Sequence, residues 1–265
     1  MADVVANGLR FHVQRLGTRH ERVGAQTVVM LHGMVMDNLS SLYYTLANPV
    51  ALHHEVVLYD LRGHGRSERP PTGYTVDDAV ADLLALLDVL EITHPVVLLG
   101  NSFGGTVALA FAIAHPDRVA GLVLVEAHFA VEGWGHHMAG SLALAAFGLD
   151  EAGVKDWLEE QGGRKLNRMA KNAEALIYDT TMLADLEAVE PVPTAALRSM
   201  QVPTLALYGE HSDILDRARD LDAELPHCTL HVFAEYTHSL LMEGSDTVKS
   251  LLGPFLASLP SETLP

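Results

Sequence analysis

A serine flanked by glycines between residues 100 and 104 is the stretch of this sequence best suited to covalent chemistry. Gly100, Ser102 and Gly104 form a G-x-S-x-G pattern, in which a sharp turn holds a serine hydroxyl exposed in a strained backbone conformation. An apolar run, 96–99, precedes the pattern and an alanine-rich stretch of helical length follows it. The order predicts a strand, a tight turn and a helix, with a nucleophilic serine at the turn.

A nucleophilic serine also needs hydrogen-bond donors for the negative charge that develops on an attacked carbonyl. The apolar run 27–31 predicts a buried strand that leads directly into His32, Gly33 and Met34. A glycine at that point lets the backbone turn sharply and leaves the next amide free. We therefore predict an oxyanion hole made by the Met34 and Phe103 N–H groups.

The elements that position these residues alternate along the chain. Strands are predicted at 27–31, 55–60, 96–99, 119–125, 202–208 and 228–233, with helices starting at Thr75, after Ser102, and over 216–225 and 246–256. An N-terminal hairpin is predicted over residues 3–16, because Asn7-Gly8 is a type I′ turn signal between alternating apolar residues. Alternating strands and helices indicate an α/β fold with a mostly parallel, doubly wound sheet, whose ligands bind at the carboxyl ends of the strands.

The rhythm of strands breaks between residues 128 and 194, where helical patterns at 142–147, 154–158 and 173–186 occur without an evident buried strand. We predict a core of residues 1–127 and 195–265 with a helical cap inserted at 128–194. Trp134 and Met138 of the cap, together with His32, are predicted to contact the substrate in an apolar pocket.

Composition excludes several classes of function. The chain has 265 residues, 49% of them apolar, and a formal net charge of −17 from 17 basic and 34 acidic residues, which argues against nucleic acid or an anionic membrane as a partner. No apolar stretch reaches the ~18 residues of a membrane span, and no secretory signal is evident at the N-terminus. A single cysteine, Cys228, fits a reducing cytoplasm. The histidines lack metal-ligand spacing, so we expect neither a metal nor a cofactor.

These motifs together resemble the α/β-hydrolase superfamily, in particular its cap-bearing serine esterases. The resemblance rests on the His32-Gly33 turn, the Asp60-Leu-Arg-Gly-His-Gly-Arg-Ser67 loop, the turn at Ser102, and acidic and histidine residues at late strand ends. It implies catalytic groups in the order nucleophile, acid, histidine, which Ser102, Asp213 and His238 satisfy.

The roles of these residues follow from their chemistry. His238, between the last predicted strand and the last predicted helix, is the base that removes the proton of Ser102, and the acid orients the imidazole. Asp213 lies one residue beyond the spacing usual in the family, counted from Gly209. Glu126, which ends the strand 119–125, stays open as the alternative acid.

The resemblance implies hydrolysis of a carboxylic ester, thioester or lactone through an acyl-enzyme on Ser102, with a neutral or weakly polar small-molecule acyl substrate. Two alternatives remain open. One is another reaction on the same fold, such as C–C bond hydrolysis, perhydrolysis, acyl transfer or cyclisation. The other is a non-catalytic binding protein, which has no need of a serine, an acid and a histidine together.

Overall fold

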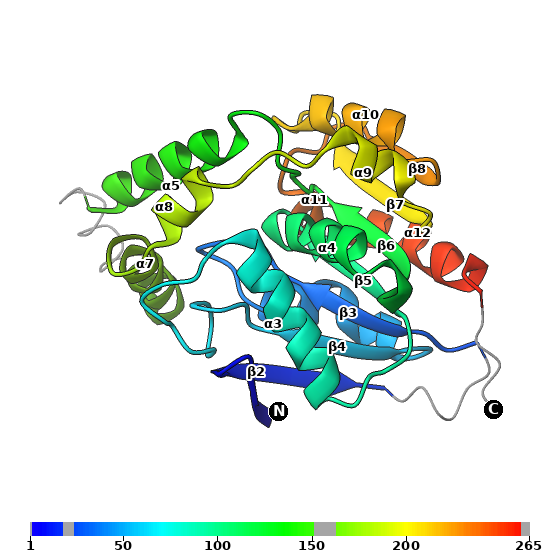
Figure 1. Cartoon of the computed structure of the whole chain (residues 1–265), viewed down its shortest axis with the longest axis horizontal. Helices are drawn as coiled ribbons and strands as arrows, with labels where there is room; N and C mark the ends of the chain where they lie inside the picture. The colour runs from blue at the N-terminus through cyan, green and yellow to red at the C-terminus, as the bar shows by residue number, and fades with distance from the viewer. Residues whose placement is uncertain (1, 18–23, 151–162, 261–265) are drawn as a thin grey trace.

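The computed structural model describes residues 2–17, 24–150 and 163–260, and its centre is a twisted sheet. The strands are β1 (Ala2–Ala6), β2 (Leu9–Leu16), β3 (Thr27–Leu31), β4 (Glu55–Tyr59), β5 (Val96–Asn101), β6 (Val119–Val125), β7 (Thr204–Gly209) and β8 (Cys228–Phe233). They form one 8-stranded sheet in the order β1-β2-β4-β3-β5-β6-β7-β8 (Figure 1). The predicted α/β class is confirmed.

The two N-terminal strands are the antiparallel part of this sheet. β1 pairs with β2, and β2 pairs with β4, in antiparallel register, whereas the other pairings are parallel. Asn7 and Gly8 both have positive φ, 47° and 75°, as a type I′ turn requires. The predicted hairpin is therefore confirmed.

Helices cover both faces of the sheet. The longer core helices are α3 (Val76–Val89), α4 (Phe103–Ala114), α10 (Leu215–Glu224) and α12 (Ser245–Ser258). Shorter helical segments are α1 (Ser40–Leu42), the π-helix η1 (Tyr43–Ala47), α2 (Asn48–Ala51), the 3₁₀ turn η2 (Pro116–Arg118) and α11 (Leu240–Glu243). None of the described helices is long and apolar enough to cross a membrane.

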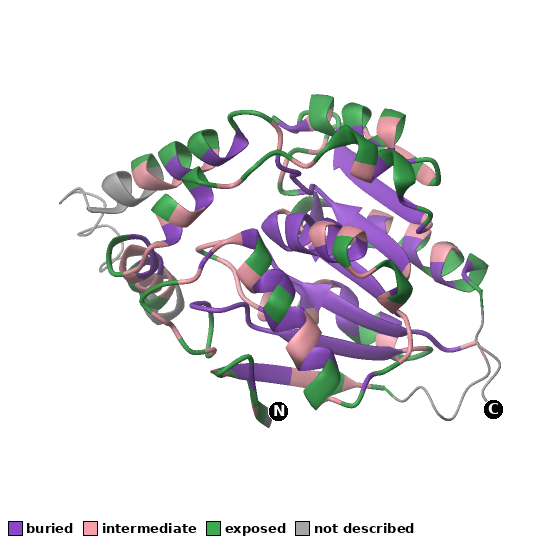
Figure 2. Ribbon diagram, in the orientation of Figure 1, coloured by how far each residue is buried: buried purple, intermediate pink, exposed green. Residues whose placement is uncertain are grey.

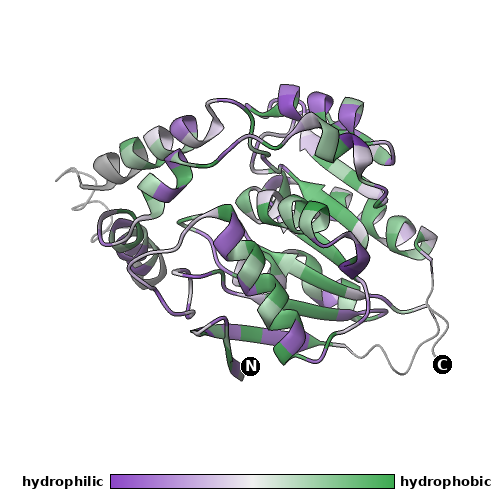
Figure 3. Cartoon of the chain, viewed as in Figure 1, coloured by the Kyte–Doolittle hydropathy of each residue, from purple (hydrophilic) through white to green (hydrophobic). Residues whose placement is uncertain are grey.

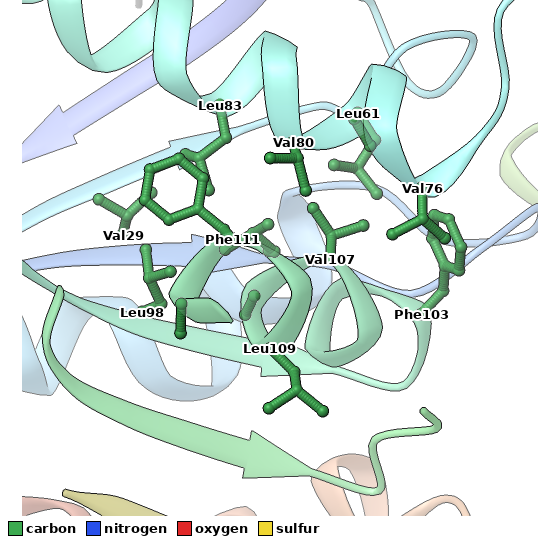
Figure 4. Close-up of a cluster of buried hydrophobic side chains, with 14 of the residues drawn as sticks. Val29, Leu61, Val76, Val80, Leu83, Leu98, Phe103, Val107, Leu109 and Phe111 are labelled. Atoms are coloured by element: carbon green, nitrogen blue, oxygen red, sulfur yellow. The ribbon is translucent and has the colours of Figure 1, made fainter. Parts of the chain in front are cut away.

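The central strands are apolar on both sides because both sides are covered, as Figures 2 and 3 show. In β5, Val96 and Leu98 belong to the apolar cluster under α3 and α4, whereas Val97 and Leu99 belong to the cluster on the opposite face with α12. Figure 4 shows the first cluster, where side chains of α3 and α4 meet above the strands. The period-2 alternation of a strand thus fills two cores at once.

Helix α3 begins as its sequence predicts. The Thr75 hydroxyl accepts a hydrogen bond from Asp78 N–H at 3.0 Å, and the Asp78 carboxylate accepts one from Thr75 N–H at 3.1 Å, which completes a capping box. The helix carries a buried ion pair on its inner side. Asp82 accepts two hydrogen bonds of 2.6 Å from Arg62 and a third, 2.8 Å long, from Asn7. Burial raises the pKa of Asp82, and the hydrogen bonds from Arg62 and Asn7 counteract that rise.

The described part of the segment between β6 and β7 is helical, as predicted. It contains α5 (Trp134–Asp150), α7 (Gly163–Tyr178), α8 (Met182–Glu187) and α9 (Thr194–Ser199), and α5, α7 and α8 lie together at one end of the molecule (Figure 1). Hydrogen bonds that join it to the core include Tyr74 N–H to Asp185, Thr181 N–H to Pro71 and the Arg69 guanidinium to Asn172. The helical pattern at 154–158 falls outside the described residues.

Two local features go beyond the predictions. The helical pattern at 173–186 is divided between α7 and α8, because the Thr180 hydroxyl bonds back to Leu176 and Thr181 N–H donates to Pro71 of the core. No element was predicted over residues 40–51, where α1, η1 and α2 follow one another. They start at Ser40, whose N–H donates a hydrogen bond of 3.0 Å to the side-chain oxygen of Asn38.

Breaking the buried ion pair is expected to destabilise the fold strongly. Asp82→Asn leaves the Arg62 guanidinium, only 7% exposed, with no counter-charge nearer than the Asp78 carboxylate at 3.7 Å, and breaking a buried ion pair costs about 3–5 kcal/mol. Asp216→Asn removes one partner of an exposed pair with Arg219 and is expected to cost less than about 1 kcal/mol. Urea unfolding of both variants measures the difference. Equal losses of unfolding free energy in the two variants would contradict the claim that the buried Arg62–Asp82 pair stabilises the fold more than the exposed pair does.

Candidate active site

Ser102 occupies the turn between β5 and α4, in the backbone conformation that the pattern predicts. Its φ of 51° and ψ of −120° are strained for a residue with a side chain. A Cβ on Gly100 would overlap the backbone of Gly104 and Gly105, and one on Gly104 would overlap the carbonyl of Leu31. The glycines are therefore required by the close approach of the helix to strands β5 and β3.

The His238 imidazole links Ser102 to two carboxylates. Its Nε2 lies 3.2 Å from Ser102 Oγ. On the other side of the ring, Nδ1 lies 3.3 Å from an oxygen of Glu126 and 3.8 Å from an oxygen of Asp213. Nδ1 is buried and makes no hydrogen bond at either distance. The structure thus brings together all three residues predicted to be catalytic, and also the alternative acid.

The two carboxylates differ sharply in environment. The Glu126 side chain is fully buried, whereas that of Asp213 is 76% exposed. Glu126 directly follows β6 with a φ of 49°, and its carboxylate accepts 2.5 Å hydrogen bonds from Gly209 N–H and from the Ser212 hydroxyl. Such bonds stabilise the ionised form of a buried carboxylate. They also fasten the end of β6 to the loop that carries Asp213.

Two backbone amides near Ser102 donate no hydrogen bond to any residue that the structure describes. Gly33 lies beside the serine, since a Cβ built on it would be 3.6 Å from Ser102 Cβ. The next amide, Met34 N–H, and the Phe103 N–H at the start of α4 donate no hydrogen bond within the described part of the chain. The start of a helix also carries the positive end of its dipole. Both predicted oxyanion donors are thus available.

Two buried histidines hold the backbone around these amides. His32 Nδ1–H donates to Gly33 C=O at 2.6 Å while its Nε2 accepts from Leu61 N–H at 3.0 Å. His64 Nε2 accepts from Val35 N–H at 2.8 Å, next to Met34, and its Nδ1–H donates to Arg62 C=O at 2.8 Å. Burial, with the neighbouring His32, lowers the pKa of His64 to about 3, so its ring stays neutral.

His32, which we predicted as a substrate contact, therefore has both ring nitrogens engaged by the backbone and is fully buried. Trp134 is 5% exposed, and its ring lies 6.3 Å from that of His128. Met138 is half-buried and packs against the main apolar cluster.

His128 is a further titratable residue at the site. Its ring centroid lies 5.5 Å from that of His238. Burial, together with His238, lowers the pKa of His128 to about 4. A neutral imidazole therefore packs against the candidate base.

A cavity of about 390 Å³ opens beside His238. Its lining includes Asn101, Tyr44, Leu241 and Met242. Tyr44 and Met242 are 75% and 74% exposed, which is high for large apolar side chains. Within the described residues, no group of three or more histidine, cysteine or carboxylate side chains could hold a metal ion.

Comparison with known proteins identifies the family. Residues 26–245 match the family described as alpha/beta hydrolase fold. The chain belongs to this family. It is 29% identical to 2-hydroxymuconate semialdehyde hydrolase of Pseudomonas sp. (strain CF600), with 96% of this chain and 93% of that protein covered.

Two further relatives carry different activities in their names. The chain is 27% identical to the pimeloyl-[acyl-carrier protein] methyl ester esterase of Aliivibrio salmonicida (strain LFI1238), covering 86% of this chain and 91% of that one. It is 26% identical to Est816, whose solved structure is described as that of an N-acyl homoserine lactone degrading enzyme, with a TM-score of 0.73 and coverage of 96% and 100%. The family thus includes esterases, lactonases and C–C bond hydrolases, and this α/β hydrolase shares its fold with all of them.

Sequence reasoning missed two residues that support the site. His64 lies in the loop 60–67, which was used above only as a motif of the family, yet it fixes the Val35 amide. Asp37 accepts a 2.7 Å hydrogen bond from Gly33 N–H. The signal available for His64 was its place between two glycines just after β4, since side chains at the carboxyl ends of parallel strands gather at one edge.

Acidification is expected to destabilise the fold through His64 and His128. Their pKa values in the fold, about 3 and 4, lie below the ordinary 6.5, so below pH 6.5 the unfolded chain binds more protons. Each histidine should then cost about 2 kcal/mol of unfolding free energy between pH 7 and pH 5. Urea unfolding at both pH values, for the wild type and for His64→Asn and His128→Asn, measures this loss. If the two variants lose as much unfolding free energy between pH 7 and pH 5 as the wild type does, His64 and His128 are not the source of the acid sensitivity.

Proposed function

We propose that this α/β hydrolase cleaves a carboxylic ester, thioester or lactone of a small-molecule acyl substrate through an acyl-enzyme on Ser102. The observation that carries the proposal is the 3.2 Å approach of His238 Nε2 to the hydroxyl of a strained Ser102. This distance lies at the upper limit of the range, about 2.6–3.2 Å, in which a base can take the proton of a nucleophile. Esterase and lactonase activities named among the relatives support the same class of reaction.

The chemistry proceeds in two half-reactions. Ser102 Oγ attacks the carbonyl carbon while His238 Nε2 takes its proton, and the resulting oxyanion accepts hydrogen bonds from Met34 and Phe103 N–H. The intermediate collapses when the C–O or C–S bond breaks, and His238 returns the proton to the leaving group. The same imidazole then deprotonates a water that attacks the acyl carbonyl. The C–O bond to Ser102 breaks, His238 returns the proton to Ser102 Oγ, and the acid is released.

C–C bond hydrolysis is a second candidate reaction, suggested by the similarity to 2-hydroxymuconate semialdehyde hydrolase of Pseudomonas sp. A serine, a histidine and an acid can serve both reactions. No residue described at the site favours it over ester cleavage. The helices over residues 128–194 act in this proposal as a cap, with Trp134 and Met138 on the side of the substrate.

Hydrolysis of p-nitrophenyl esters from acetate to octanoate tests the reaction class. Ser102→Ala is expected to lower kcat/KM by several orders of magnitude, because the acyl-enzyme cannot form. Ser250→Ala removes an exposed hydroxyl of α12, away from the cavity beside His238, and should retain nearly full activity. Background rates in the wild type equal to those of Ser102→Ala would contradict ester hydrolysis.

Within this proposal, Glu126 is the carboxylate that orients His238. Its oxygen is the nearer to Nδ1, it is buried, and its position is fixed by Gly209 and Ser212. Asp213 lies farther away on a side chain exposed to water, where charge interactions are weaker. A small approach of the imidazole toward Glu126 would complete the missing hydrogen bond of Nδ1.

Four variants separate the two acids. Glu126→Gln is expected to lower kcat on the order of 10²–10⁴-fold with KM little changed, and Asp213→Asn less than about tenfold. Ser212→Ala loosens the same loop but keeps the Glu126 carboxylate, so it should retain most activity. In Asp213→Asn/Glu126→Gln the loss due to Glu126 should persist. A collapse in Asp213→Asn, with no further loss in the double variant, would assign the role to Asp213.

A further inference from the structure

The cavity beside His238 extends into a larger one under helix α7. That second cavity measures about 640 Å³ and is lined by the turn after β3, by the loop after β4 and by α7. Met36, Asp37, Tyr44 and Met169 line both cavities. The two therefore form one groove, with His238 in the wall of the smaller cavity and Arg66 and Arg168 in the wall of the larger one.

The loop and helix at the far end are tied to each other. Arg69 of the loop donates to Asn172 of α7 at 3.4 Å and to the carbonyl of Gly63 at 3.3 Å. A Cβ on Gly63 would be 2.6 Å from the Leu176 side chain, so the glycine lets α7 approach this closely. Figure 1 shows α7 beside the loops that leave the sheet at this end.

Arg66 and Arg168 differ from the other arginines whose side chains the structure describes. Each of those uses its guanidinium in a hydrogen bond or ion pair: Arg10, Arg15, Arg62, Arg69, Arg118, Arg198, Arg217 and Arg219. The guanidinium groups of Arg66 and Arg168 have no partner among the described residues, although the chain has 34 acidic residues and only 17 basic ones. Both line the same groove.

The carboxylates that line this cavity do not bind the guanidinium groups of Arg66 and Arg168. Asp37 accepts hydrogen bonds from Gly33 and Asn38 N–H, both at 2.7–2.8 Å. Asp60, which is buried, accepts from Leu39 and Arg66 N–H, both at 2.8 Å. Each of these carboxylate oxygens already has a backbone donor. Polar neutral side chains such as Gln14, Tyr44 and Asn172 also line the cavity, but the two guanidinium groups are its free donors that carry a permanent positive charge.

We propose that Arg66 and Arg168 bind a carboxylate at the far end of the acyl group, so that the preferred substrate is the monoester of a dicarboxylic acid. The inference rests on the proposed ester hydrolysis and names its substrate class. A guanidinium matches a carboxylate through two parallel hydrogen bonds, and such charge-assisted bonds are stronger than neutral ones. The scissile carbonyl lies at Ser102 and the acyl chain follows the groove past Met36 and Tyr44. An anionic acyl group replaces the neutral one expected from composition.

The test compares two esters of one length: mono-p-nitrophenyl adipate, which is an anion, and its methyl-capped neutral form. The ratio of kcat/KM for the anion to that for the neutral ester is expected to fall about 3–10-fold in Arg66→Gln or Arg168→Gln and about 10–100-fold in the double variant, mainly through KM. Lys171→Gln removes the same charge from α7 without lining the groove, so its ratio should stay within about twofold of wild type.

An unchanged ratio in the double variant, with the neutral ester still hydrolysed, would overturn the carboxylate site and leave the esterase intact. A fall of equal size in Lys171→Gln would assign the effect to overall charge and also overturn it. If the wild type hydrolyses neither ester, titration calorimetry of Ser102→Ala with monomethyl adipate measures binding alone. Binding that is lost when Arg66→Gln and Arg168→Gln are added supports the site. Binding that is absent, or unaffected by those two changes, refutes it. Stronger competition by inorganic phosphate than by adipate would refute a carboxylate ligand.

Discussion

The site depends on the close packing of helix α4 against the ends of β5 and β3. That packing forces Ser102 into a φ of 51° and places the helix start directly after the serine. A side chain at Gly100 or Gly104 would enter the space that the backbone occupies. The strain at Ser102 is offset by the apolar cores on both faces of the sheet, which hold β5 and α4 in place. The same contact positions the Phe103 amide beside the hydroxyl.

A second layer of interactions stabilises the backbone rather than the substrate. His32 and His64 are buried neutral imidazoles that bind backbone groups of the turns after β3 and β4. Glu126 performs a comparable task on the other side of the serine, where it ties the end of β6 to the loop after β7. Such outer contacts keep reactive groups within the small tolerance that catalysis requires.

Much of this arrangement was predictable because it is local. The hairpin, the central strands, the capped start of α3 and the turn at Ser102 each have a signal within a few residues, and each was confirmed. The distances from His238 to Glu126 and to Asp213 have no such signal. They depend on how β6 and β7 pair and on how the loop at Ser212 folds, which are tertiary properties.

The same limit explains the other differences. The break between α7 and α8 arises from a hydrogen bond between Thr181 and Pro71, which are far apart in the chain. The role of His64 comes from its contact with Val35 across two loops. The free guanidinium groups of Arg66 and Arg168 become evident only when every other described arginine has been paired. Spacing along the chain contains none of this information.

The central claim is that Ser102 is an activated nucleophile. Mass spectrometry of peptides from the protein treated with a fluorophosphonate tests it most directly, because the reagent phosphonylates a serine whose proton a base removes and releases fluoride. Our account predicts one adduct, on the peptide that contains Ser102, and none on this peptide in His238→Ala. No adduct on the wild type, or an adduct on another residue with Ser102 unmodified, would contradict it.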